Sequence, residues 1–245
     1  MGIPPFLTDA ELEQERTPVE LFAWVDAKCK ELGGTPEARE FARSGDRLAK
    51  KFYDEVRPLA LVARREFGDR PGVTVKPNLG NDNFDGTISF RDRPQIFIEI
   101  TYAKNGYYDS LRMEFLAQGG HGNHLARPSV VGTRHSPNRR VDIPNEAVCR
   151  DVTLNEHLRY VEDCLKAKAD AFYGPQHVLV VVVNDYSPFR DRRDVDILDK
   201  LVTRRLCRLS LDFGRLVILG ERGELFISKL LDRPRMRRPM ISRKI

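Results

Sequence analysis

Residues 84–103 read FDGTISFRDRPQIFIEITYA, two apolar segments joined by a short turn, and this stretch decides the fold. Side chains of a β-strand alternate between two faces, so each segment has an apolar face and a second face that carries an acid. In the second segment, Glu99 is on the face opposite to that of Ile98. In the first segment, Asp85 is on the face opposite to that of Ile88. The pattern predicts a strand pair with one carboxylate on each strand.

The two carboxylates have two interpretations. An ionised carboxylate is costly to bury unless it is paired or bound to a cation, and oxygen ligands on neighbouring strands are typical of a divalent-metal site. Alternatively, both strands lie at a sheet edge and Asp85 and Glu99 face water. The alternation of faces does not decide between these readings.

The segments that follow the strand pair are a helical stretch, a lysine-rich helix and the apolar run VLVVVV at 178–183. Over residues 36–230 this order resembles the PD-(D/E)xK superfamily of restriction-endonuclease-like nucleases. That family's core is a helix, a three-stranded meander, a helix and a further strand. Its members carry an acid at the start of the second meander strand, and an acid, one residue and a lysine on the third. Asp85 and Glu99 match the acids, whereas Thr101 stands at the lysine position.

A replacement lysine is sought on the helix predicted for 153–173, because some divergent family members place it there. Thr153 with Glu156 predicts a capping box at the start of this helix. Lys168 falls on its apolar face, which points toward the sheet. Lys104 and Lys76 are the rival lysines. The alternative for Lys168 is a side chain whose stem covers apolar surface while its charge stays in water. The apolar positions of this face are Leu154, Leu158, Val161, Leu165 and Phe172.

The resemblance implies a chemistry for these residues. Asp85 and Glu99 would hold Mg²⁺ or Mn²⁺ together with the backbone carbonyl oxygen of Ile100. Lys168 would orient or help deprotonate water, or stabilise developing negative charge. Glu55 is the acid expected on the first core helix. The implied activity is that of an endonuclease hydrolysing phosphodiester bonds in DNA, in a defence or mobile-element setting.

Composition is that of an ordinary soluble chain. The 245 residues suffice for one large domain or a domain with additions, and 31% of them are charged. No apolar run approaches the length of a membrane helix, so no membrane partner is expected. The start, MGIPPFLTDAELEQER, lacks the pattern of a signal peptide, which favours a cytoplasmic location. Four widely spaced cysteines without a CxxC motif are typical of reduced thiols.

The chain is expected to form a layered α/β domain with a mixed central sheet flanked by helices. Residues 1–34 predict an N-terminal helical extension, 35–232 the restriction-endonuclease-like domain, and 233–245 a basic tail. The first core helix is expected to run from about Pro36 to Phe67 and to break near Pro58. The run at 177–185, HVLVVVVND, indicates a central strand that is buried on both faces.

Residues 119–150 form an irregular basic insertion. Its arginines are either a flap that contacts the nucleic-acid backbone or part of a solvated loop. The tail from Arg233 onward has six cations and no acid, and is either a phosphate contact or a solubilising end. His121 and His124 have no nearby cysteine, which disfavours zinc. The expected backbone contacts are Arg127, Arg134, Arg139 and Arg140.

Three hypotheses for function remain open. The first is a metal-dependent DNA nuclease, acting alone or as a homodimer. The second is an inactive member of the same fold that binds nucleic acid or protein. The third is an unrelated α/β enzyme acting on a small molecule, although the chain has no Walker motif, dinucleotide fingerprint or GxSxG elbow.

Overall fold

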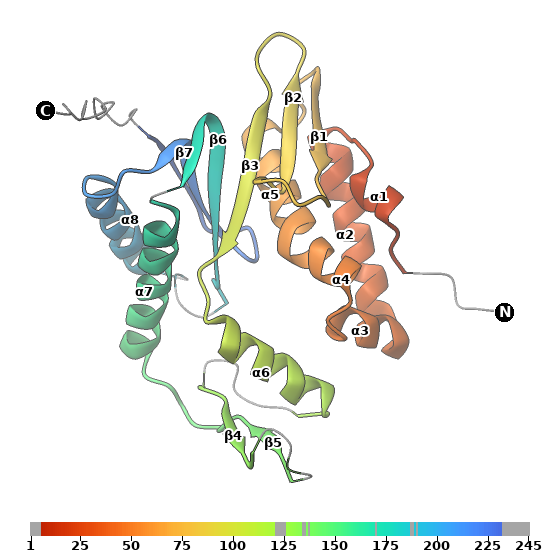
Figure 1. Cartoon of the computed structure of the whole chain (residues 1–245), viewed down its shortest axis with the longest axis vertical. Helices are drawn as coiled ribbons and strands as arrows, with labels where there is room; N and C mark the ends of the chain where they lie inside the picture. The colour runs from red at the N-terminus through yellow and green to blue at the C-terminus, as the bar shows by residue number, and fades with distance from the viewer. Residues whose placement is uncertain are drawn as a thin grey trace, which may run out of the picture.

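The computed structural model describes residues 6–120, 126–133, 136, 138–169, 171–186, 189 and 191–231 (Figure 1). The N-terminal helices are α1 (Asp9–Glu13), α2 (Pro18–Gly34), α3 (Pro36–Arg43), α4 (Arg47–Lys51), the π-helical η1 (Phe52–Val56) and α5 (Arg57–Phe67). There follow β1 (Val73–Pro77), β2 (Gly86–Phe90), β3 (Ile96–Tyr102), α6 (Gly106–Ala117), β4 (Ser129–Val131) and β5 (Arg140–Asp142). The last elements are α7 (Arg150–Lys168), β6 (Phe172–Val183), α8 (Arg192–Leu206), β7 (Asp212–Gly220) and β8 (Phe226–Leu230).

A six-stranded mixed sheet in the order β1-β2-β3-β6-β7-β8 forms the centre of the described chain. The strands β1, β2 and β3 form an antiparallel meander, β6 and β7 run parallel to β3, and β8 pairs antiparallel with β7. Helices α2 and α5 lie on one side of the sheet, and α7 and α8 on the other (Figure 1). The predicted fold class, α/β with a mixed sheet flanked by helices, is confirmed.

Strand β6 lies between two hydrophobic cores. Val180 is completely buried in the core that includes Leu21 of α2 and Leu59 of α5. Its neighbour Leu179 is completely buried in the second core, which includes Leu165 of α7 and Leu198 of α8. Successive side chains of a strand point to opposite faces, so a strand with helices on both sides must be apolar throughout. The predicted central position of this run is confirmed.

The N-terminal helices belong to the first core. Leu12 of α1 and Leu21 of α2 are completely buried together with Val75 of β1 and Ile98 of β3. The backbone of Arg16 forms a bridge to Val75, with hydrogen bonds of 3.0 and 2.7 Å in the two directions. The helical extension expected for residues 1–34 is therefore continuous with the sheet's packing.

The helical stretch that precedes the meander differs from its prediction. It is interrupted between α3 and α4, where Gly45 adopts a φ of 75° and Asp46 caps α4. A left-handed φ is accessible to glycine at little cost, which makes this the natural break point. At Pro58 the helix continues, because the preceding turn is π-helical and the Arg57 amide donates to the carbonyl of Phe52. The predicted break at Pro58 is wrong.

Helix α7 also has different ends from those predicted. It begins at Arg150 with Cys149 as N-cap, so Thr153 is a buried residue inside the first turn and its hydroxyl donates to the Cys149 carbonyl. The predicted capping box is wrong. Phe172 does not belong to the apolar helix face, because it begins β6 and is 92% exposed. Tertiary contacts of the Arg150 guanidinium with Asp194 fix this earlier start.

The insertion at 119–150 contains a short hairpin of β4 and β5. Together with α6 it encloses a small separate core whose buried members are Leu111, Ala126, Val141 and Ile143. In the described part of the chain, no helix is both long and apolar enough to cross a bilayer.

Candidate functional site

The two carboxylates lie next to each other on the meander. Gly86, the first residue of β2, pairs with Ile98, and the Asp85 amide just before it donates to the Ile98 carbonyl at 2.7 Å, so Asp85 lies beside the segment of β3 that contains Glu99. Glu99 shares a sheet face with Phe97, because both alternate with the buried Ile98 along β3. Glu99 pairs with Leu179 of β6, whose side chain lies in the core formed with α7, so Glu99 faces the side of α7.

A backbone hydrogen bond holds the Asp85 side chain, and its surroundings disfavour the ionised carboxylate. Its Oδ2 accepts a hydrogen bond of 2.7 Å from the Ile100 amide. The pKa of Asp85 is raised to about 6, mainly by burial and also by the negative charges of Glu55 and Glu99, against the opposing effect of the Ile100 hydrogen bond. A carboxyl with this pKa is ionised at neutral pH only against an electrostatic cost.

Lys168 reaches the same site from the last turn of α7. Its Nζ donates to Glu99 Oε1 at 2.5 Å and to the Tyr173 hydroxyl at 3.2 Å. Burial lowers the pKa of Lys168, but the ion pair with Glu99 and the hydrogen bond with Tyr173 outweigh burial and the net shift is upward. The ammonium is therefore charged at neutral pH, and the structure brings Lys168 and Glu99 together.

Tyr173 was not singled out by the sequence, although it completes this contact. Its ring stacks on Phe213 at a centroid distance of 4.2 Å, and its amide donates to the Asp212 carboxylate at 3.0 Å. These contacts fix the hydroxyl that accepts from Lys168. The residue lies at the start of β6, where no local periodicity marks a side chain as belonging to the site.

The rival lysines lie elsewhere. Lys104 pairs with Asp109 at 2.7 Å and lies 3.9 Å from Asp54, beyond the end of β3. Lys76 is exposed on β1, where it pairs in register with Thr87. Of the three lysines considered, only Lys168 has an ion pair with Glu99 among the described residues.

Glu55 and Ile100 both affect Asp85. Glu55 pairs with Lys51 at 2.7 Å, and burial is the main cause of its raised pKa. It influences Asp85 through its charge. Ile100 contacts Asp85 through its amide nitrogen.

The free oxygens of Asp85 and Glu99 are two of the ligands that a hard divalent cation needs. Within the described chain, Asp85 Oδ1 and Glu99 Oε2 carry no hydrogen bond, because Ile100 and Lys168 occupy the other oxygens. Mg²⁺ is commonly bound by one or two carboxylates, with water and substrate phosphate completing the shell. Among the described residues, no group of three or more His, Cys, Asp or Glu side chains is arranged to hold a metal. Asp85 and Glu99 are thus the two candidate protein ligands.

The arginines of the insertion are mostly engaged within the protein. Arg139 forms two hydrogen bonds with the Glu114 carboxylate, one of them 2.9 Å long, and Arg127 pairs with Glu156 at 3.0 Å. Arg140 is exposed and has no ion pair with a described residue. Arg134, like the three histidines and the tail from Arg233, lies outside the described residues.

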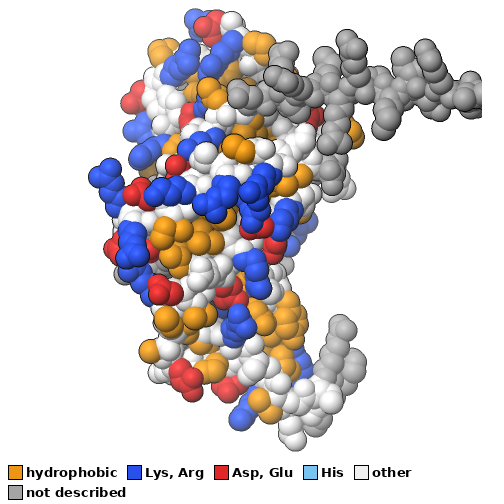
Figure 2. Space-filling view, turned by 90° about the vertical axis from the view of Figure 1, so that its left-hand side faces the viewer, with side chains coloured by type: hydrophobic (Ala, Val, Ile, Leu, Met, Phe, Trp, Pro, Cys, Tyr) orange, Lys and Arg blue, Asp and Glu red, His pale blue; other side chains and the backbone are white. Residues whose placement is uncertain are grey.

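A basic surface that the sequence did not reveal lies on α8. Figure 2, which looks onto the side of α7 and α8, shows Lys and Arg side chains gathered over the upper half of this face. Asp196 is the one exposed acid among the described residues of α8, and it forms no ion pair with a described residue. The exposed cations of this α8 basic face, none paired with a described carboxylate, are Arg192, Arg193, Lys200, Arg204 and Arg208.

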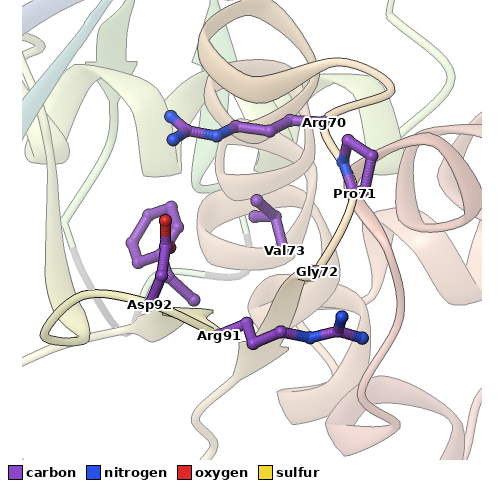
Figure 3. Close-up of a pocket in the computed structure, with 7 residues that line it drawn as sticks. Arg70, Pro71, Gly72, Val73, Arg91 and Asp92 are labelled. Carbon is purple, nitrogen blue, oxygen red and sulfur yellow. The ribbon is translucent and has the colours of Figure 1, made fainter.

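The cavity shown in Figure 3 lies at the opposite end of the meander from Asp85 and Glu99. It has a volume of about 160 Å³ and lies beside Val73 and Phe90, which pair at that end. The side chains of Arg70 and Arg91 extend in opposite directions (Figure 3). Their guanidinium groups therefore do not converge on one ligand.

A larger cavity of about 470 Å³ lies at the carboxyl ends of β6 and β7. Among its described lining residues, Asp185 is 3% exposed; its Oδ1 accepts from the Arg222 amide at 3.0 Å, and its Oδ2 has no partner there. Small-molecule enzymes with parallel sheets commonly bind ligands at this position. The cavity is the structural feature that bears on the small-molecule hypothesis.

No protein-family model matches the chain, and no curated protein or solved structure matches it significantly. The function is therefore inferred from the site itself.

Proposed function

We propose that the protein is a metal-dependent nuclease that hydrolyses phosphodiester bonds in DNA, the substrate that the PD-(D/E)xK resemblance implies. The observation that carries the proposal is the contact of 2.5 Å between Lys168 and Glu99, next to Asp85, whose carboxylate accepts from the Ile100 amide. Two carboxylates and an ammonium from separate elements meet at one place, which is the combination that phosphoryl transfer requires.

The residues have distinct roles in this proposal. Asp85 and Glu99 bind Mg²⁺ or Mn²⁺, which supplies Lewis-acid polarisation of the phosphate and lowers the pKa of water. Lys168 places a fixed positive charge where negative charge develops on the phosphate, and Tyr173 orients that ammonium. The α8 basic face and Arg140 contact the phosphate backbone and fix the substrate's position.

The raised pKa of Asp85 supports the assignment. A carboxylate that is buried beside Glu55 and Glu99 is repelled by their charges, and a bound cation would relieve this repulsion. Perturbed pKa values of this kind cluster at functional sites.

The test is cleavage of supercoiled plasmid and of RNA with Mg²⁺, Mn²⁺ or EDTA. Glu99→Gln and Lys168→Met are each expected to slow cleavage by about a hundredfold or more, because each removes a charge that acts on the reacting phosphate. Lys166→Met is the matched control for the lysine, because Lys166 lies on the same helix and pairs with Glu162. Asp199→Asn is the control for the acid, because Asp199 pairs with Lys229 at 2.7 Å away from the site. Equal activity of site and control variants would contradict the proposal.

The alternative is an inactive member of the same fold that binds nucleic acid or protein. It is favoured by the pairing of Glu99 with Lys168, which satisfies the carboxylate without a cation. A melting temperature that rises with MnCl₂ in the parent protein and not in Asp85→Asn would support the nuclease. Tight nucleic-acid binding without any metal effect would support the alternative. Sedimentation of the same samples tests the predicted homodimer.

A further inference from the structure

The sheet face that carries Glu99 has helices over only part of its width. The core formed with α7 and α8 draws its buried strand residues from β6 and β7, with Ala103 just beyond β3. None of the described residues of β1, β2 or β3 is a buried member of that core. The side chains on this part of the sheet, which we call the open face, include Thr74, Lys76, Thr87, Ser89 and Phe97.

One row of residues crosses the open face beside the carboxylates. Lys76 pairs with Thr87, Thr87 with Phe97, and Phe97 with His177. Glu99 lies two residues further along β3, on the same face. The row therefore borders the candidate site directly.

The aromatic members of this row contact one another. Phe97 stacks on His177 with centroids 4.8 Å apart and an interplanar angle of 21°. Phe84 packs against Phe97 in a tilted arrangement with centroids 5.0 Å apart, and Tyr173 meets His177 edge-on at 5.5 Å. All four rings are partly exposed to solvent. We call Phe84, Phe97, His177 and Tyr173 the aromatic row.

The composition of the row is unusual for its place. Antiparallel strands with one solvated face normally carry polar residues there. Burial lowers the pKa of His177 against the opposing charges of Glu99 and Asp212, so the imidazole is neutral at pH 7. Its Nδ1 is buried and has no hydrogen-bond partner in the described chain. The row therefore presents flat, uncharged rings next to two acids and a lysine.

Flat rings on a sheet surface suit unpaired nucleobases. Stacking on aromatic side chains is the usual way in which proteins bind single strands, because every base has a π-face and no duplex partner occupies it. A base within a duplex is already stacked on its neighbours and cannot reach such rings without being extruded. The exposed Lys76 at the end of the row suits a flanking phosphate.

We infer that the aromatic row binds unpaired bases of single-stranded nucleic acid and that Lys76 contacts the adjoining phosphate. This inference rests on the proposed function, since it names the substrate class of the same site. The scissile phosphate then lies beside Asp85 and Glu99 while its neighbouring base stacks against Phe97 and Phe84.

Binding without cleavage tests the inference independently of the activity. A labelled single-stranded oligonucleotide and its duplex are titrated with the full chain in EDTA and followed by fluorescence anisotropy. Phe97→Leu is expected to weaken single-strand binding by about fivefold to a hundredfold, the range measured for loss of one stacked base. Duplex binding should be unchanged. Tyr107→Leu is the control, because Tyr107 is an aromatic residue that is 62% exposed on α6.

A second variant guards against misfolding. Phe84 ends the row, so Phe84→Leu should reproduce the effect while the melting temperature stays close to that of the parent. Unchanged single-strand affinity in both variants would overturn the inference, as would a parent protein that binds the duplex at least as tightly as the single strand. The two proposals can fail separately. If Phe97→Leu loses single-strand binding but the parent cleaves neither single-stranded nor duplex DNA with any metal, the aromatic row is a binding site and the proposed nuclease activity is refuted.

Discussion

The two halves of the central sheet differ in how many of their faces are covered. In β6 the consecutive residues Leu179, Val180 and Val181 are all completely buried, because helices lie on both sides. In β3 the buried Ile98 alternates with the partly exposed Phe97 and Glu99, because helices cover one side only. The same sheet thus changes from a purely structural half to one that has a free face.

This difference explains where chemistry can reside. A strand buried on both faces has no place for an ionised side chain, since burial without a partner is costly. A strand with one open face can hold Glu99, which is partly exposed and paired with Lys168. Lys168 lies in the last turn of α7, at the border of the covered half, and so can contact the open one.

The largest effect on stability is expected in the covered half. Leu179→Ala should lower the free energy of unfolding by about 2–5 kcal/mol, because it removes buried contacts and leaves a cavity. Thr87→Ala, on the open face, should change it by less than about 0.5 kcal/mol. Urea denaturation of both variants measures the contrast. Similar losses in the two would mean that the open face is covered in solution.

The second prediction concerns the free energy of unfolding that the ionised Asp85 carboxylate costs. The pKa of Asp85 is raised to about 6, so its folded state binds a proton more tightly than the unfolded state does. The parent is therefore destabilised progressively as pH rises from about 4 to 6, and uniformly above that. Asp85→Asn should increase the free energy of unfolding at pH 7.5 by about 1–3 kcal/mol in EDTA, and the gain should vanish near pH 4.

Urea denaturation at the two pH values measures this gain. A variant less stable than the parent at pH 7.5 would assign Asp85 a structural role through its hydrogen bond with Ile100.

The third prediction compares two lysines on one helix. Lys168→Met leaves the Glu99 carboxylate, whose side chain is only 13% exposed, without its partner, and should cost about 1–2 kcal/mol. Lys166→Met removes an exposed lysine from Glu162, which keeps its second partner Arg205 at 2.7 Å, and should cost less than about 0.5 kcal/mol. Thermal melts of both variants test this. Equal effects would indicate that Lys168 is as solvated as Lys166.

The smallest effect is expected from the insertion. Arg140→Ala should reduce the slope of log affinity against log salt for DNA by about one, because Arg140 is exposed and free to contact phosphate. Arg139→Ala should leave the slope nearly unchanged, because Arg139 is held by Glu114. Titrations at several salt concentrations distinguish the two. A larger change for Arg139 would show that its ion pair opens when DNA binds.

Local sequence patterns predicted much of the framework correctly. The alternation around Ile98 and Glu99 gave the strand pair and its buried face, and the unbroken apolar run at 178–183 gave the central strand. Both are set by the period of a strand, which is a property of neighbouring residues. Helix boundaries were less predictable. Arg150 starts α7 because its side chain meets Asp194, 44 residues away, and no local signal encodes such a contact.

The site itself depended on the tertiary structure. The sequence alone offered Lys76, Lys104 and Lys168 as candidates near the acids and determined only that Lys168 shares the inner face of its helix. Which lysine meets Glu99 was decided by the placement of α7 against β3, and the aromatic row by the register of β2, β3 and β6. Register and strand order arise from pairings between distant segments, so no periodicity within one segment specifies them.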